Sequence, residues 1–88
     1  MLWTVEFLRE AVADLAKLDR PVRARVLKRI KWLAESFDTL TPAVLTGEFR
    51  DFYKLRAGDW RVFYKVDWRG FRITVYYIDR RDKAYKLD

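Results

Sequence analysis

The spacing of hydrophobic residues changes once along the chain, and this change constrains the fold more than any other feature. From Phe7 to Phe37, hydrophobic residues recur every three or four positions, which is the period of one face of an α-helix. After Gly47 the period becomes two, which is typical of β-strands that bury one face. The chain therefore has a helical half followed by a sheet-forming half. The helices must cover the sheet for both hydrophobic surfaces to be buried.

The helical half is predicted to begin with a strand and to continue as two antiparallel helices. Residues 1–6 mix β-branched and aromatic side chains, which favours a strand. The first helical stripe consists of Phe7, Leu8, Ala11, Val12, Leu15 and Leu18. The second consists of Val22, Val26, Leu27, Ile30, Leu33, Ala34 and Phe37. Pro21 suits the first turn of the second helix, and Pro42 and Gly47 indicate a loop over residues 38–47.

The second half predicts an antiparallel meander of three strands, over residues 49–56, 60–66 and 71–78. Ala57-Gly58 and the segment 67–70 are the predicted turns. The fold class is therefore α+β: an N-terminal strand, a two-helix hairpin and a three-strand meander packed on the helices. With 88 residues and no linker-like stretch, we expect a single domain over residues 1–88.

The predicted hairpin fixes which side chains face the helices. If Ala57-Gly58 is a two-residue loop, Leu55 lies opposite Trp60 and Lys54 lies opposite Arg61. Tyr53, Leu55, Trp60 and Val62 then form the sheet side of the core. Lys54, Arg56 and Arg61 share the opposite face. The same register, carried through the second turn, places Ile78 opposite Arg61.

Charge and composition limit the chemistry that this chain can perform. It has 19 Lys and Arg against 13 Asp and Glu, for a net charge of +6, and it has neither histidine nor cysteine. The commonest general base and the commonest thiolate and imidazole metal ligands are therefore excluded. A net charge of this size suits a polyanionic partner, and it equally suits a charge that serves solubility alone.

The cations of the predicted sheet suit a phosphodiester. Guanidinium groups bind phosphate oxygens in pairs and stabilise the charge that grows during phosphoryl transfer. Nearby aromatic side chains could stack on unpaired bases; they are Phe52, Phe63 and Tyr85. For any one of these cations alone, an ordinary solvated surface position is the favoured interpretation. The functional hypothesis requires several of them to converge on one pocket.

Residues 45–66 resemble the signature of the RelE/ParE superfamily of toxins. That signature is a Leu-x-Gly loop, a strand reading tyrosine, basic, Leu, Arg, a Gly-Asp turn, and a strand reading aromatic, Arg, Val, x, Tyr. The order strand, helix, helix also matches, so the resemblance covers nearly the whole chain. The ending Ile78-Asp-Arg-Arg-Asp-Lys-Ala-Tyr85 is similar to that of the RelE-like branch, in which an arginine and a tyrosine follow the last strand. Arg81 and Tyr85 match these two positions.

The resemblance implies the toxin of a toxin–antitoxin pair that cleaves mRNA on the ribosome. It assigns the catalytic roles to Lys54, Arg56, Arg61, Arg81 and Tyr85. Further RNA contacts are expected from Arg50, Phe52, Phe63, Arg80 and Lys83. The implied reaction is attack of a message 2′-hydroxyl on the adjacent phosphate, with no metal and no cofactor. The implied partners are a small RelB-like antitoxin, the ribosome and mRNA, in the cytoplasm and without a membrane.

Two other functions remain open at this point. One is a ParE-like inhibitor of DNA gyrase that performs no chemistry, against which the Arg81 and Tyr85 ending argues. The other is a non-toxic relative that only binds nucleic acid. Its main support is Phe52, which occupies a position where relatives have a lysine. Arg80 likewise occupies a position where relatives often have a histidine.

Overall fold

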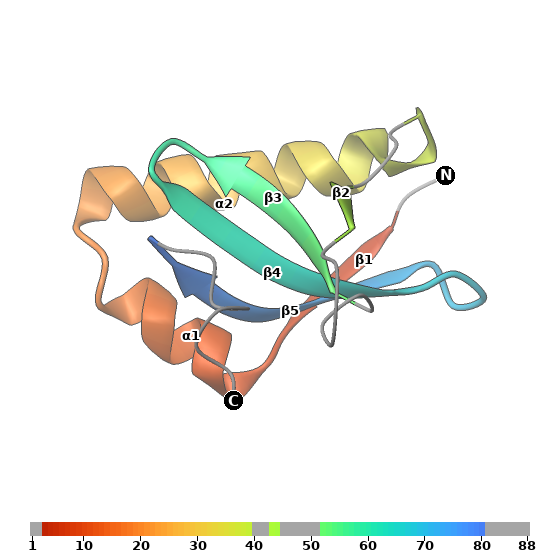
Figure 1. Cartoon of the computed structure of the whole chain (residues 1–88), viewed down its shortest axis with the longest axis horizontal. Coiled ribbons are helices and arrows are strands. Elements are labelled where there is room, and N and C mark those ends of the chain that lie inside the picture. Colours follow the sequence, from red (N-terminus) through yellow and green to blue (C-terminus); the bar gives the residue numbers. More distant parts are fainter. Residues whose placement is uncertain (1–2, 40–42, 45–51, 81–88) are drawn as a thin grey trace.

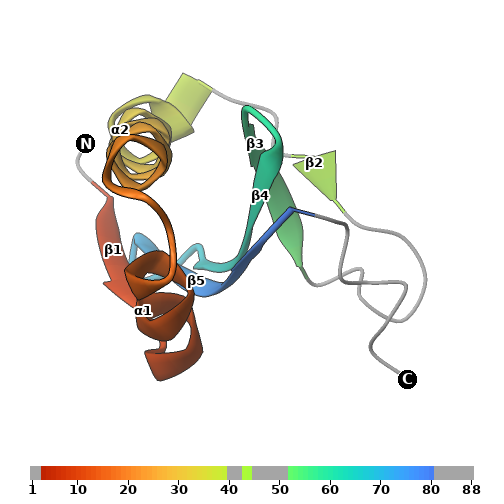
Figure 2. The ribbon, with the colours of Figure 1, turned by 90° about the vertical axis from the view of Figure 1, so that its left-hand side faces the viewer.

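The structure, a computed structural model, describes residues 3–39, 43–44 and 52–80. These residues form one five-stranded sheet with two helices packed on the same side of it (Figures 1 and 2). The elements, in chain order, are β1 (Thr4–Phe7), α1 (Arg9–Ala16), α2 (Arg20–Ser36), the 3-10 helix η1 (Phe37–Thr39), β2 (Ala43–Val44), β3 (Tyr53–Ala57), β4 (Trp60–Asp67) and β5 (Arg72–Asp79). The predicted α+β class is confirmed.

The sheet has the strand order β1-β5-β4-β3-β2. β1 runs parallel to β5, and the other neighbours are antiparallel. The predicted meander is therefore the centre of a wider sheet. The prediction of a loop over residues 38–47 was wrong in part, because the end of η1 and the whole of β2 lie within it and Ala43 pairs with Lys54. A two-residue strand carries no alternation, so its sequence gave no signal.

One arginine joins the two helices. Arg23 of α2 donates its Nε to the Leu15 carbonyl and its Nη2 to the Leu18 carbonyl, both at 2.9 Å. Carbonyls at the end of a helix have no partner inside it, and a cation there also complements the helix dipole. Pro21 occupies the first turn of α2, as predicted.

Within the described ranges, no helix is long and apolar enough to cross a membrane.

The main core lies between the helices and one face of the sheet. The helices, the turn between them and η1 contribute Ala11, Leu18, Val26, Ile30, Leu33, Ala34 and Phe37, and the sheet contributes Leu55, Ala57, Val62, Tyr64, Ile73, Val75 and Ile78. The predicted first stripe began too early, because Phe7 ends β1 and Leu8 only precedes α1. Val12 and Leu27 were also wrong as core residues, since Val12 is 54% exposed and Leu27 is 40% exposed. Each directly follows a buried residue. A turn of about 100° per residue lets only one of two successive side chains face the sheet.

The hairpin between β3 and β4 turns one residue later than predicted. Ala57 pairs with Trp60, so the two loop residues are Gly58 and Asp59 rather than Ala57 and Gly58. Gly58 has a φ of 64° and occupies the first loop position. A tight hairpin with glycine at that position matches the twist of the strands, whereas alanine there would be strained. The predicted pairs are therefore displaced by two residues along β4.

A β-bulge interrupts the pairing of β4 with β5. Tyr64 pairs with Val75 but Phe63 pairs with Tyr77, so Tyr76 is the extra residue. The predicted register holds from the Asp67 end of β4 up to Tyr64. Beyond the bulge it is wrong, because one strand has gained a residue. Ile78 consequently lies opposite Val62 rather than opposite Arg61, and it is 3% exposed in the core.

Candidate nucleic-acid interface

The sheet has a second face that points away from both helices (Figure 2), which we call the open face. Side chains alternate between the two faces along a strand, and directly opposed residues share a face. The described side chains that the register places on the open face, together with Phe52 just before β3, are Thr4, Glu6, Phe52, Lys54, Arg56, Arg61, Phe63, Lys65, Asp67, Arg72, Thr74, Tyr77 and Asp79. The open face therefore brings together the predicted site residues of β3 and β4.

Two arginines lie directly opposite each other on the open face. Arg56 pairs with Arg61 in the hairpin, and the predicted pairing of Lys54 with Arg61 was wrong because of the turn displacement. A displacement of two residues keeps every side chain on its predicted face. Lys54, Arg56 and Arg61 therefore still share one surface. From the other side, Arg29 of α2 donates its Nε to the Arg56 carbonyl at 3.2 Å and so holds the strand end.

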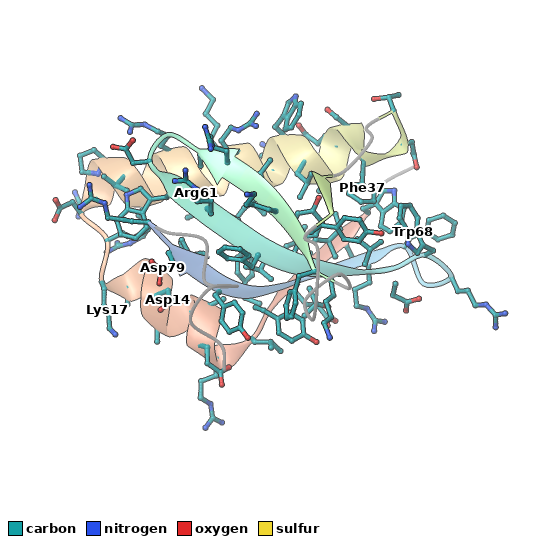
Figure 3. The ribbon with its side chains drawn as sticks, viewed as in Figure 1. Asp14, Lys17, Phe37, Arg61, Trp68 and Asp79 are labelled. Carbon is teal, nitrogen blue, oxygen red and sulfur yellow. The ribbon has the colours of Figure 1, made fainter. Side chains whose placement is uncertain are left out.

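The guanidinium of Arg61 donates hydrogen bonds to backbone carbonyls of two neighbouring segments, the hairpin turn and the residue after β5. Its Nη1 donates to the Asp59 carbonyl at 2.7 Å and to the Arg80 carbonyl at 3.1 Å. Arg61 thus ties the hairpin turn to the end of β5. Its partner on β5 is Asp79 (Figure 3), so a carboxylate shares the face with the arginine pair. The open face is cationic at this end, but its charge is moderated by one acidic residue.

Lys54 lies one row from the arginine pair. A row here means a set of residues directly opposed across the strands. Lys54 is opposite Phe63, and Phe63 is opposite Tyr77. Successive residues on one face of a strand are about 6.6 Å apart. The long side chains of Lys54 and Arg56 can therefore reach a common phosphate group between their rows.

The two phenylalanines expected to stack on RNA bases are covered in this structure. Phe63 is 1% exposed and Phe52 is 9% exposed. The Phe52 ring lies 5.7 Å from that of Tyr77, and the Phe63 ring lies 6.1 Å from it. Their hydrophobic surface is buried in a second, smaller aromatic cluster on the open face. Neither ring presents a free surface on which a base could stack.

Three further side chains, which the sequence analysis had not singled out, complete this cluster. They are Lys65 of β4 and Tyr76 and Tyr77 of β5. The Phe52 and Tyr76 rings meet edge to face at 5.0 Å, and the Lys65 ammonium lies 4.8 Å from the Phe52 ring centre. The continuous aromatic and β-branched run of residues 71–78 indicated only a buried central strand.

The other predicted site residues follow β5 in the sequence, apart from Arg50, which precedes β3. Arg80 is exposed, and its guanidinium lies 5.9 Å from the centre of the Trp60 ring. Arg50, Arg81, Lys83 and Tyr85 lie outside the described residues. Their assigned roles remain predictions.

Outside the open face, one phenol and one carboxyl group have pKa values shifted from their usual range. Burial raises the pKa of the Tyr64 hydroxyl well above its usual range, and the nearby Tyr53 hydroxyl adds to this. Tyr64 therefore remains protonated and is no general base at neutral pH. The Trp3 indole donates a hydrogen bond of 3.0 Å to Asp38, and this lowers the pKa of that carboxyl.

The arrangement can bind a phosphodiester and stabilise added negative charge on it. Arg56 offers an exposed guanidinium, and Lys54 and Arg61 lie on the same face. Carboxylate oxygens are in the minority there. Among the described ranges, no group of three or more acidic side chains is arranged to hold a metal ion.

Comparison with known proteins places the chain in a family. The family described as "ParE toxin of type II toxin-antitoxin system, parDE" matches residues 5–85. A search of curated protein sequences gives no significant match.

Solved structures share the fold. One is the RelBE2 toxin–antitoxin complex of Mycobacterium tuberculosis, with a TM-score of 0.82 at 24% identity, covering 92% of this chain and 100% of that one. Another is the isolated RelE toxin of E. coli, with a TM-score of 0.71 at 23% identity and coverage of 96% and 92%. A third is the YoeB/ParE toxin of Agrobacterium tumefaciens, with a TM-score of 0.73 at 15% identity and coverage of 90% and 99%. The chain belongs to the ParE toxin family of type II toxin–antitoxin systems, within the RelE/ParE superfamily.

Proposed function

We propose that this toxin is a ribosome-dependent mRNA endoribonuclease and that the open face holds the message. The observation that carries the proposal is the cross-strand pair Arg56 and Arg61 with Lys54 one row away. Like charges directly opposed across a sheet repel each other, which destabilises the hairpin slightly. A bound phosphate would relieve this repulsion. The clustering is therefore better explained by an anionic ligand than by solubility.

The proposed reaction is transfer within the RNA. The 2′-oxygen attacks the adjacent phosphorus while the bond from phosphorus to the 5′-oxygen breaks. The products are a 2′,3′-cyclic phosphate and a 5′-hydroxyl, the proton of the 2′-hydroxyl being removed and one being delivered to the leaving oxygen. Arg56 and Arg61 stabilise the charge on the nonbridging oxygens. Lys54 or Tyr85 takes the 2′-proton, and Arg81 assists the leaving group.

The ribosome supplies what these side chains lack. Lysine and tyrosine have ordinary pKa values of about 10, so they are weak bases at neutral pH unless neighbouring cations favour deprotonation. Holding the message in an attack geometry compensates for a weak base. The need for a positioned message explains the proposed dependence on the ribosome, and a toxin that acts on ribosomes would act in the cytoplasm. Several structures of the same fold are complexes of RelE-type toxins with RelB-type antitoxins, and we propose a small antitoxin of that kind as the second partner.

Induction of the toxin in cells, with mapping of message 5′ ends, tests the proposal. The expected result is growth arrest with new 5′-hydroxyl ends inside translated messages. The variant Arg56→Ala should lose most of this cleavage. The matched control Arg20→Ala removes another exposed arginine, at the start of α2, and this variant should retain the cleavage. Growth arrest with intact messages contradicts the nuclease assignment.

A second candidate is a non-enzymatic gyrase inhibitor. The observation that favours it is the carboxylate of Asp79 in the same row as Arg61, together with the covered rings of Phe52 and Phe63. These features reduce the surface available to RNA. DNA supercoiling by purified gyrase distinguishes the two candidates. Inhibition by the toxin, with messages intact after induction, would establish the second.

A further inference from the structure

Lys65 of β4 occupies an unusual environment on the open face. Its ammonium lies 4.8 Å from the centre of the Phe52 ring and 5.2 Å from that of Tyr76. The side chain is half-buried. Within the part of the chain that the structure describes, no carboxylate lies within ion-pair distance of it. Two aromatic rings are its charge-stabilising neighbours.

Aromatic rings stabilise a cation but leave its hydrogen-bonding capacity largely unused. A ring face attracts the ammonium electrostatically, and the ammonium still carries three N–H donors. The bulge at Tyr76 places one of the two rings beside Lys65. Bulges commonly redirect side chains next to functional sites. The lysine is held in place, partly removed from water and able to donate to an anion.

The position of Lys65 extends the line of cations along the sheet. On β4 it follows Phe63 by two residues, and Phe63 is the partner of Lys54. The cations therefore occupy three successive rows, spaced by about 6.6 Å: Arg56 with Arg61, then Lys54, then Lys65. A single-stranded nucleic acid presents its phosphates at regular intervals along one backbone. The charges of the open face match a strand running along β3 and β4.

We propose that Lys65 binds a backbone phosphate of the message next to the reacting one, with Phe52 and Tyr76 forming the walls of this subsite. The inference rests on the proposed function and extends it. Phe52 then has a role without stacking on a base, because its ring holds the lysine. The subsite reads a phosphate and carries no base specificity. It adds affinity for RNA and does not take part in bond breaking.

Binding of a short, 5′-fluorescein-labelled single-stranded RNA, followed by anisotropy over a series of salt concentrations, tests this subsite without ribosomes. Lys65→Gln should weaken binding by about tenfold at low salt. The slope of log affinity against log salt should decrease by about 0.7, as expected for one lost phosphate contact. Lys65→Arg should retain most of the affinity. Lys17→Gln, which removes the same charge at the end of α1, should change it by less than about twofold.

The outcomes separate this inference from the function on which it rests. If Lys54→Gln weakens RNA binding and Lys65→Gln does not, the subsite is wrong and the nuclease proposal is unaffected. If Lys65→Gln weakens binding as expected but induced cells keep intact messages, the subsite holds and the nuclease proposal fails. A Lys65→Gln variant that melts lower but binds RNA normally assigns the lysine a structural role and overturns the inference. An unaltered chain that binds no RNA overturns the subsite, and the nuclease proposal is then decided by message cleavage in induced cells.

Discussion

Replacement of Arg61 by alanine should destabilise the fold as well as reduce function. The guanidinium donates Nη1 to the Asp59 and Arg80 carbonyls at 2.7 and 3.1 Å, and so joins the hairpin turn to the end of β5. Alanine removes both bonds at once. The end of β5 also leads into the segment that carries the predicted Arg81 and Tyr85. A functional loss in Arg61→Ala therefore has two sources that must be measured separately.

The size of the structural part can be worked from these contacts. Hydrogen bonds from a charged donor contribute about 1.5–3 kcal/mol each when sheltered from water. Both bonds of Arg61 lie near solvent, so we take the pair together at about 2 kcal/mol. For a domain of this size, each kcal/mol shifts the melting temperature by about 4–8 °C. Arg61→Ala should therefore melt about 8–16 °C lower than the unaltered chain.

Urea unfolding followed by circular dichroism measures this directly, with Arg56→Ala as the matched control. Arg56 is exposed and opposes Arg61, so its removal relieves repulsion and should change the unfolding free energy by less than about 0.5 kcal/mol. Arg61→Lys keeps the charge, but its single ammonium cannot reproduce both bonds. Its unfolding free energy should therefore lie between those of Arg61→Ala and Arg56→Ala. If Arg61→Ala proves as stable as Arg56→Ala, the bonds of Arg61 contribute nothing and our account of this end of the sheet is refuted.

Three further predictions test other parts of the structure. Gly58→Ala should lower the unfolding free energy by about 1–2 kcal/mol in urea titrations, because a φ of 64° is strained for alanine while the added Cβ meets only Arg25 at 3.5 Å; an unchanged midpoint would contradict the turn geometry. Asp14→Ala should cost about 1–3 kcal/mol, since the carboxylate accepts a hydrogen bond of 2.9 Å from the Ile78 backbone N–H, and Asp14→Asn should recover part of it. Tyr64→Phe should change the alkaline limb of the stability curve. Burial raises the pKa of Tyr64 in the folded state, so the unaltered chain loses stability as pH rises above about 10 and the variant should lose less; parallel curves would refute this.

Much of the site could be predicted from alternation alone because the faces of a strand depend on parity. The hairpin turn was displaced, yet Leu55 and Val62 are buried and Lys54 and Arg56 share the open face as expected. A displacement by an even number of residues preserves both faces. The partners across the strands are less well determined. Which arginine opposes which residue depended on glycine taking the first loop position.

Burial of the open-face aromatics could not be predicted from the same pattern. Alternation places Phe52 and Phe63 on the open face, and a face away from the helices was expected to be wet. In the structure these rings cover each other together with Tyr76 and Tyr77. Aromatic side chains bury large areas, so four of them on one face are enough to form a small cluster of their own. Their number, rather than their spacing, was the signal.

The bulge at Tyr76 was also present in the sequence, as a change of parity. Ile73 and Val75 occupy odd positions and face the core, whereas the next aliphatic residue, Ile78, occupies an even one. Without an extra residue, Ile78 would face outward at a loss of about 1.5–3 kcal/mol, and Asp79 would be pushed into the core at a cost of several kcal/mol, roughly. One unpaired residue avoids both penalties. The same residue brings Asp79 opposite Arg61 and a tyrosine ring beside Lys65, so the stability of the core and the charge of the candidate site are decided at one position.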